Sequence, residues 1–187
     1  MPDFYLIGGP NGAGKTTIAL RLLPSLGCYE YVNADSIAAA MSPFRPDTMA
    51  LRAGYLMMKR LRELADEGVS FATESTLAAR AFVPFINECK AKGYNFNLLY
   101  IWLPNVEMAI ARVADRVRSG GHSIPEETIR RRYEAGRKNF VSLYMPIAET
   151  WTAYDNSADE LVLIATGGRE EETVVHQPQS WQEIIRA

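Results

Sequence analysis

Residues 9–16 read Gly-Pro-Asn-Gly-Ala-Gly-Lys-Thr, which matches G-x-x-x-x-G-K-[ST], the pattern of a phosphate-binding loop. Its glycines leave successive backbone N–H groups free to turn inward around the phosphates of a nucleotide, with a helix N-terminus behind them. The pattern predicts nucleotide contacts from Gly9, Pro10, Asn11, Gly12, Ala13, Gly14, Lys15, Thr16 and Thr17.

The sequence around this loop fits a strand, a loop and a helix in that order. Phe4–Ile7 is a short apolar run before the loop, and Thr17–Leu23 is compatible with a helix that ends at Pro24. Lys15 is then expected to reach the β- and γ-phosphates, and the Thr16 hydroxyl is expected to ligate Mg²⁺. A glycine-rich turn without a ligand is the alternative interpretation.

Composition restricts the partners of the chain. Its 187 residues fit one domain over 1–187, and a net charge of -2 gives no general attraction to nucleic acid or to an anionic membrane. Cys28 and Cys89 lack metal-ligand spacing, so we expect two reduced, buried side chains. No uninterrupted run of 18 apolar residues occurs, and we expect a cytoplasmic protein with no membrane contact.

Strands alternate with helices of ten or more residues along most of the chain. This alternation predicts an α/β fold, a P-loop kinase-like three-layer sandwich with a mainly parallel central sheet. Strands are expected at residues 4–7, 28–32, 69–73, 96–103, 161–166 and 173–176, and helices at 17–23, 36–41, 48–67, 79–92, from 105, from 126, 140–154 and 180–186. An edge strand and a helix are expected to close the chain over about 170–187.

Polar residues follow two of the expected strands. Asp35 comes just after the second strand, and Glu74 and Thr76 come just after the third. Ligands bind at the carboxyl ends of parallel strands, so we expect these groups on the edge that carries residues 9–16, with the second strand beside the strand of that loop. Asp35 is the candidate general base, and Glu74 and Thr76 are candidate acceptor contacts. A helix cap at Asp35 and a solvated loop at 74–76 are the alternatives.

Arginines gather between residues 112 and 137, on two expected helices joined by a Gly-Gly break. This pattern predicts an arginine-rich helical lid over phosphates. Arg112 and Arg116 are four residues apart on one helix face, so one could stack on the adenine while the other meets the γ-phosphate. Arg116 is the first candidate for the phosphate, Arg112 the second, and the run Arg130–Arg132 stays open.

The remaining pattern distinguishes among P-loop proteins. The most apolar run, Leu98–Leu103, ends in Pro104-Asn105 rather than in an aspartate, so the Walker B strand of motor and transporter ATPases is missing. Small-molecule kinases hold Mg²⁺ through the P-loop hydroxyl, phosphates and waters. The sequence therefore favours an ATP- and Mg²⁺-dependent kinase with a small-molecule acceptor.

With these motifs in view, the chain resembles the zeta toxin family of P-loop kinases, and in particular the short stand-alone bacterial branch described as predicted ABC-type ATPases. The resemblance covers about residues 4–168. It rests on the P-loop together with Asn33-Ala34-Asp35, Glu74-Ser75-Thr76-Leu77, Gly120-Gly121-His122 and Arg130-Arg131-Arg132-Tyr133.

The resemblance implies phosphorylation of a nucleotide sugar, UDP-N-acetylglucosamine, and an antitoxin protein as a possible partner. It implies that Asp35 is the base, that Glu74 and Thr76 contact the sugar, and that Arg116 or Arg112 contacts the γ-phosphate. The chain departs from the family pattern at two positions. His122 stands where better-known zeta toxins have a second lid arginine, and Ala78 stands where they have another arginine, for which Arg80 could substitute.

Two alternatives stay open at this point. One is a P-loop kinase for another hydroxyl, on a different metabolite or on a nucleic-acid end. The other is a binding module in which ATP gates association with a protein partner. The pair Glu74 and Thr76 favours the enzyme, because a pure switch has no need of an acceptor side.

Overall fold

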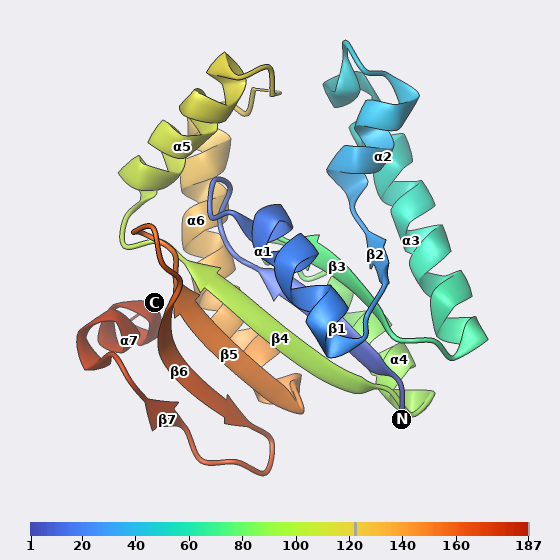
Figure 1. Ribbon diagram of the computed structural model, residues 1–187, viewed down its shortest axis with the longest axis vertical. Helices are drawn as coiled ribbons and strands as arrows, with labels where there is room; N and C mark the ends of the chain where they lie inside the picture. Colours follow the sequence, from blue (N-terminus) through green and yellow to red (C-terminus); the bar gives the residue numbers. More distant parts are fainter. Residues whose placement is uncertain (122, 187) are drawn as a thin grey trace.

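The computed structural model describes residues 1–121 and 123–186, and within them the chain forms a seven-stranded sheet (Figure 1). The strands are β1 Asp3–Gly8, β2 Glu30–Val32, β3 Phe71–Ser75, β4 Asn95–Trp102, β5 Thr150–Asp155, β6 Val162–Gly168 and β7 Val174–Val175. They lie in the order β2-β3-β1-β4-β5-β6-β7, with β1 to β5 parallel and β6 and β7 antiparallel to their neighbours. The expected mainly parallel sheet is confirmed.

Seven α-helices connect or follow these strands in the described ranges. They are α1 Lys15–Leu22, α2 Ala34–Met41, α3 Ala50–Glu67, α4 Phe82–Ala91, α5 Val106–Arg118, α6 Glu126–Asn139 and α7 Pro178–Ile185. Short 3-10 turns occupy Leu23–Leu26, Pro46–Met49 and Met145–Ile147, and a π-helical turn occupies Phe140–Tyr144.

Apolar side chains on both faces of the central strands pack against helices on each side of the sheet, which gives three layers. In β4, Phe96, Leu98 and Tyr100 enter one core, whereas Leu99 and Ile101 enter the other. Because successive side chains of a strand point to opposite faces, a buried strand needs apolar residues at nearly every position. Helices α3, α4 and α7 supply the first core, and α1 and α5 supply the second.

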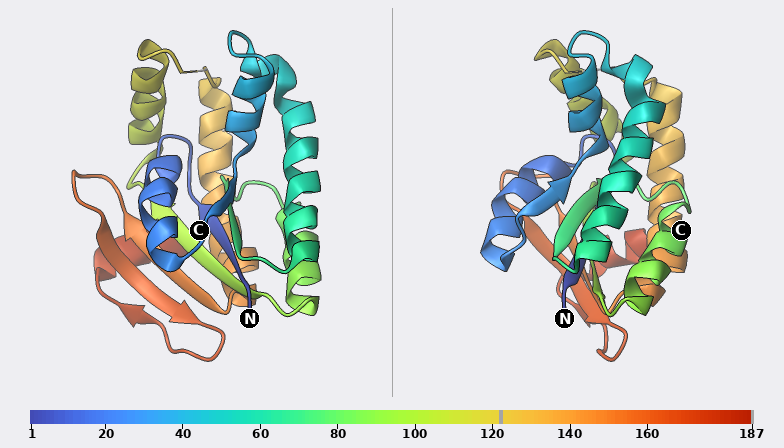
Figure 2. Two further views of the ribbon diagram at one scale, coloured as in Figure 1. Left: turned by 45° about the vertical axis from the view of Figure 1, so that its right-hand side comes forward. Right: turned by 90° about the vertical axis from the view of Figure 1, so that its right-hand side faces the viewer.

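Two helical pairs rise above the carboxyl ends of the strands. Helices α2 and α3 stand on one side of the loop between β1 and α1, and α5 and α6 stand on the other (Figures 1 and 2). The residues at the carboxyl ends of β1 and β3 lie between them. The two helical pairs therefore flank the edge of the sheet where the sequence predicts the ligand (Figures 1 and 2).

The structure corrects the predicted helix over residues 140–154. Only Phe140–Ile147 is helical, as a π turn followed by a 3-10 turn around Pro146, and Thr150–Asp155 is the strand β5. The side chains of Trp151 and Ala153 are buried while their neighbours are exposed or half-buried, which is the period of two of a strand. Strand β5 pairs with β4 from Asn97 to Trp102, and that pairing is a long-range contact that local spacing does not reveal.

The structure also corrects the place of the second strand. Strand β2 lies at the edge and pairs with β3, and β3 separates it from β1. The expectation that Asp35 follows a strand next to the P-loop strand is therefore wrong, and Glu74 lies on that neighbour instead, near the end of β3. The expected turn at residues 167–169 is also shifted, since β6 continues to Gly168.

Two further expectations concern burial and membranes. Cys28 and Cys89 are free and buried, as predicted, with 2% and 0% of their surfaces exposed. Among the residues that the structure describes, none of the helices combines the length and the apolar character that a membrane crossing requires.

Candidate active site

The P-loop joins the end of β1 to the first turn of α1 with a backbone that glycine alone adopts readily. Gly9, Gly12 and Gly14 have φ values of 146°, 78° and 82°. A side chain at Gly9 would overlap the carbonyl oxygen of Ile101 in β4, so this position also needs glycine for space. The loop is also tied to β3, because the Gly9 N–H donates 3.2 Å to the carbonyl oxygen of Ser75. A glycine-rich loop before a helix N-terminus is a common form of anion site.

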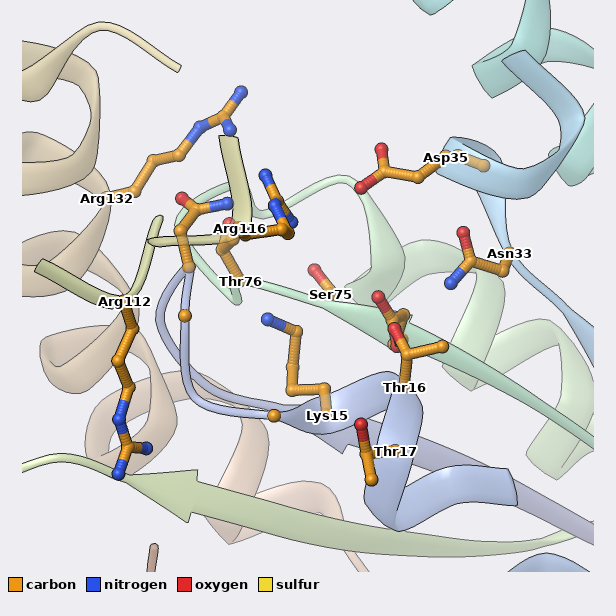
Figure 3. Close-up of a pocket in the computed structure, with 15 residues that line it drawn as sticks. Lys15, Thr16, Thr17, Asn33, Asp35, Ser75, Thr76, Arg112, Arg116 and Arg132 are labelled. Atoms are coloured by element: carbon orange, nitrogen blue, oxygen red, sulfur yellow. The ribbon is translucent and has the colours of Figure 1, made fainter. Parts of the chain in front are cut away.

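A cavity of about 350 Å³ opens beside this loop (Figure 3). The P-loop and α1, the start of α2, the end of β3 and the helices of the predicted lid all contribute to its wall. The lining residues are Asn11, Gly12, Gly14, Lys15, Thr16, Thr17, Asn33, Ala34, Asp35, Glu74, Ser75, Thr76, Arg112, Arg116 and Arg132. The structure thus brings the predicted Asp35, Glu74 and Thr76 together with the P-loop.

Lys15 is a buried ammonium at the base of the cavity. Only 8% of its surface is exposed, and its Nζ donates a hydrogen bond of 2.9 Å to the carbonyl oxygen of Pro10. Burial lowers the pKa of Lys15, and the nearby Glu74 and Asp35 carboxylates oppose that shift. The Lys15 side chain points into the cavity (Figure 3). A phosphate bound there would stabilise the charged form of this buried ammonium.

Glu74 is the centre of a hydrogen-bond network between the P-loop and β2. Its Oε2 accepts 2.8 Å from the Thr16 hydroxyl and 2.6 Å from the Tyr31 hydroxyl. The Tyr31 oxygen in turn accepts 3.1 Å from Nδ2 of Asn33. Burial, and then the charge of Glu74, raise the pKa of Tyr31 well above its usual range, so the phenol keeps its proton as a donor.

Asp35 stands in the first turn of α2, and its carboxylate points into the cavity toward the arginines of α5 and α6 (Figure 3). Asn33 caps this helix, because its Oδ1 accepts a hydrogen bond of 3.0 Å from the N–H of Ser36. Asn33 therefore performs the capping role that is the alternative for Asp35. One amide side chain fixes both the start of α2 and the Tyr31 hydroxyl.

The arginines of the predicted lid differ in where their side chains lie. Arg116 and Arg132 line the cavity from α5 and α6 (Figure 3). Arg130 forms ion pairs with Glu107 and Glu126 on the exposed side of α6. Arg132 is thus the member of the run 130–132 that reaches the cavity. The sequence could not show which of three consecutive arginines faces the cavity.

Arg112 also borders the cavity, but its guanidinium turns to the loop after β5. It donates 2.7 Å to the carbonyl oxygen of Asn156 and 3.1 Å to that of Ser157. Asn156 in turn donates 2.8 Å to the carbonyl oxygen of Ala13 in the P-loop. Arg112 and Asn156 therefore join α5, the loop after β5 and the P-loop. The sequence gives no local signal for Asn156, because its partners lie more than 40 residues away.

Two other predicted residues have different outcomes. Arg80 is exposed and does not line the cavity, so the structure does not bring it to the predicted acceptor side. His122 lies outside the described residues. Tyr31 and Asn33 are not among the site residues predicted from sequence, although Asn33 belongs to a motif beside Asp35.

Hard oxygen donors fit a magnesium site at Thr16 and Glu74. The two oxygens lie within hydrogen-bond distance, and carboxylate and hydroxyl oxygens are ligands that Mg²⁺ accepts. Among residues 1–121 and 123–186, no three His, Cys, Asp or Glu side chains gather as a metal-binding group. A site that depends largely on phosphates and water, with few protein ligands, suits Mg²⁺ better than a protein-only cage.

Comparison with known proteins gives a family and a fold. The family model described as Zeta toxin matches residues 1–168. An uncharacterised protein of Haemophilus influenzae is 31% identical over 125 residues, which cover 67% of this chain and 88% of that protein.

Solved structures share the fold at low identity. A chain of the AvrRxo1-ORF1:-ORF2 complex with ATP has a TM-score of 0.78 at 19% identity; the match covers 98% of this chain and 63% of that one. The PezAT toxin-antitoxin system of Streptococcus pneumoniae gives 0.63 at 18%, covering 100% and 84%. A gluconokinase of Sinorhizobium meliloti gives 0.52 at 13%, covering 84% of both chains. These similarities establish a P-loop kinase architecture.

Proposed function

Because the chain belongs to the zeta toxin family, we propose that it transfers the γ-phosphoryl group of ATP to a hydroxyl of a nucleotide sugar such as UDP-N-acetylglucosamine. Family and fold together support an ATP-dependent kinase. The cavity supports transfer to a second substrate. Its P-loop side has Lys15 and Thr16 for ATP, and its far side has Asp35 and Thr76 for an acceptor.

The donor side binds the phosphates of ATP. N–H groups of the P-loop bind the β-phosphate, and the Lys15 ammonium leaves the Pro10 carbonyl to meet the γ-phosphate. Arg116 and Arg132 supply positive charge from the opposite wall as α5 and α6 close over the nucleotide. Arg112, held on Asn156 and Ser157, borders the nucleotide on the side of the loop after β5.

Thr16 and Glu74 would hold the magnesium ion, directly or through a water molecule. When bound, Mg²⁺ supplies charge that offsets the charge of the outer phosphates. Glu74 keeps its place through the hydroxyl of Tyr31, which donates to the same oxygen as Thr16. The Thr16 hydroxyl then turns its lone pairs toward the phosphate side.

Asp35 acts as the general base. Its carboxylate accepts the proton of the acceptor hydroxyl while the hydroxyl oxygen forms a bond to the γ-phosphorus. The bond from the γ-phosphorus to the bridging oxygen of ADP breaks on the opposite side, and ADP leaves with that electron pair. Thr76 and Ser75, at the end of β3, offer hydroxyl groups that orient the acceptor.

Mass spectrometry of a reaction with ATP, Mg²⁺ and UDP-N-acetylglucosamine tests the acceptor. We expect a phosphorylated nucleotide sugar from the wild-type protein, and formation of that product about 10²–10⁴-fold slower from Asp35→Asn. A panel of other nucleotide sugars, small polyols and nucleic acids with free 5′ ends provides the comparison. If one of these compounds is phosphorylated and UDP-N-acetylglucosamine is not, that compound is the acceptor. If the protein binds ATP but phosphorylates no compound of the panel, an ATP-gated binding module is favoured.

The family also suggests a protein partner. PezAT is a toxin-antitoxin system by name, and we propose that this chain likewise has an antitoxin. Co-purification with the product of a neighbouring open reading frame, together with growth arrest that this product relieves, would support the pairing. Expression without any effect on growth would contradict it.

A further inference from the structure

The segment after β3, residues 76–79, has a conformation that its own sequence does not favour. Leu77 has φ of 58°, and among the non-glycine residues that the structure describes no other has positive φ. For an L-residue with a branched side chain this region carries strain, which the surrounding structure must offset. We refer to residues 76–79 as the acceptor-side loop, because Thr76 lines the cavity and the others continue from it.

The side chain of Leu77 anchors the acceptor-side loop to the end of β1. It is fully buried and packs against Gly8 at the end of β1, where any side chain would collide with the Leu77 methyl groups. The Leu77 N–H donates 3.1 Å to the hydroxyl of Ser75. The loop is therefore anchored next to the P-loop, but these contacts leave its carbonyl groups to be satisfied elsewhere.

Asn139, the last residue of α6, satisfies two of those carbonyl groups. Its Nδ2 donates 2.8 Å to the oxygen of Leu77 and 3.2 Å to that of Ala78, and its side chain is almost fully buried. The Tyr144 hydroxyl donates to the next carbonyl, that of Ala79. Three successive carbonyl groups of the loop are thus bound by one helical segment.

The π turn explains how two residues five positions apart reach the same loop. In an α-helix, positions i and i+5 lie on different faces, whereas a π turn has i to i+5 hydrogen bonds and brings such positions nearly above one another. The turn occupies Phe140–Tyr144, directly after Asn139. It therefore places Asn139 and Tyr144 on the side of the acceptor-side loop.

Arg132, Gly136 and Asn139 form one stripe of α6, at spacings of four and three residues. Arg132 lines the cavity, and Gly136 lies so close to Thr76 that a Cβ atom would overlap the Thr76 carbonyl oxygen. Asn139 completes the stripe at residues 77 and 78. The helix that carries an arginine toward the phosphates thus also seats the loop that carries Thr76.

We propose that Asn139 is a positioning residue that holds the acceptor-side loop, and so Thr76, in the geometry that binds the acceptor. This inference rests on the proposed kinase activity for its kinetic consequence, but not for its structural one. Asn139 is not a catalytic residue, because it contacts backbone carbonyl groups and does not line the cavity.

The test compares Asn139→Leu with Ser142→Ala. Ser142 lies in the same helical segment and is exposed, and its hydroxyl donates 2.8 Å to the carbonyl oxygen of Lys138 within the segment. Hydrogen exchange of the peptide covering residues 76–81 is expected to accelerate about tenfold in Asn139→Leu, because the carbonyl groups of Leu77 and Ala78 lose their buried amide donor. Exchange in α1 and in Ser142→Ala is expected to match the wild type.

Kinetics provide the second measurement. We expect KM for the acceptor to rise about tenfold in Asn139→Leu, while KM for ATP changes less than about twofold, because the P-loop is not altered. Asn139→Gln, which keeps the amide donor, is expected to recover part of the loss. A general loss of stability would change both KM values and exchange throughout the chain, and would not be rescued by Gln.

The outcomes separate this inference from the proposed acceptor. Unchanged exchange at residues 76–81 in Asn139→Leu would overturn the positioning role, whatever substrate the protein uses. If that exchange accelerates but wild-type protein does not phosphorylate UDP-N-acetylglucosamine, the positioning role of Asn139 is retained and UDP-N-acetylglucosamine is rejected as the acceptor. If Asn139→Leu does not fold, the same exchange measurement on Asn139→Gln and Asn139→Ser decides, and wild-type rates in both would reject the role.

Discussion

The Thr16 hydroxyl donates a hydrogen bond of 2.8 Å to Oε2 of Glu74. This bond joins the first turn of α1 to the end of β3, 58 residues later in the chain. It ties the residue that ends the P-loop motif to the carboxylate on the neighbouring strand. The P-loop helix and the strand beside β1 therefore share a polar contact before any ligand binds.

Removing the Tyr31 hydroxyl should make the position of the Glu74 carboxylate less fixed. We expect Tyr31→Phe to lower kcat/KM about tenfold and to raise the Mg²⁺ concentration needed for half-maximal activity, because Glu74 loses a donor at 2.6 Å. A hydrogen bond to a charged group contributes about 1.5–3 kcal/mol, and the partial exposure of Glu74 favours the lower end of that range. A magnesium titration of initial rates measures the effect.

Tyr29→Phe is the matched control for this experiment. Tyr29 lies just before β2, and 79% of its surface is exposed. Its replacement should leave rates and magnesium dependence at wild-type values. An equal loss in both variants would remove the specific role given to the Tyr31 hydroxyl.

Two helical glycines should respond to alanine with opposite signs. Gly136→Ala places a methyl group against the Thr76 carbonyl and should destabilise the protein by about 1–3 kcal/mol. Gly54 lies inside α3 with nothing within 4 Å of the place that a methyl group would take, so Gly54→Ala should stabilise by up to about 1 kcal/mol. Urea unfolding monitored by tryptophan fluorescence gives both values. Equal effects at the two sites would contradict the close contact between α6 and the loop.

The buried Lys15 should give the ligand-free protein a distinctive pH dependence. Burial lowers its pKa in the folded state below the usual 10.5, so the unfolded chain binds more protons between those two values. The free energy of unfolding should therefore rise with pH across that window, relative to Lys15→Met. ATP favours the charged ammonium, so its stabilising effect should fall over the same window.

Denaturant unfolding of both proteins at several pH values above neutrality measures this difference. Subtracting the Lys15→Met curve removes the contribution of the tyrosines, whose raised pKa values act in the opposite direction above about pH 10. Parallel curves for the two proteins would show that Lys15 does not titrate differently on folding.

The edge of the sheet that carries the site could be predicted from sequence. The P-loop motif implies a strand before it and a helix after it, and the carboxyl ends of parallel strands meet at one edge, so Asp35, Glu74 and Thr76 could be assigned to that edge. The strand order could not be predicted, because nothing local distinguishes β2 from β3 as the neighbour of β1.

The supporting residues could not be predicted for a different reason. Tyr31, Asn156 and Asn139 act through hydrogen bonds to partners 43, 143 and 62 residues away. Strand β5 comes soon after the helical turns of Phe140–Ile147, and its pairing with β4 is also long-range. Local periodicity carries no information about such partners.

Single-turnover phosphoryl transfer from radiolabelled ATP to the acceptor measures whether Asp35 is the general base. Asp35→Asn should reduce the rate about 10²–10⁴-fold while ATP affinity stays within about twofold of the wild type. Asp47→Asn, at an exposed aspartate of the 3-10 turn Pro46–Met49, is the control and should react at the wild-type rate. Transfer by Asp35→Asn at the wild-type rate would show that Asp35 is not the general base.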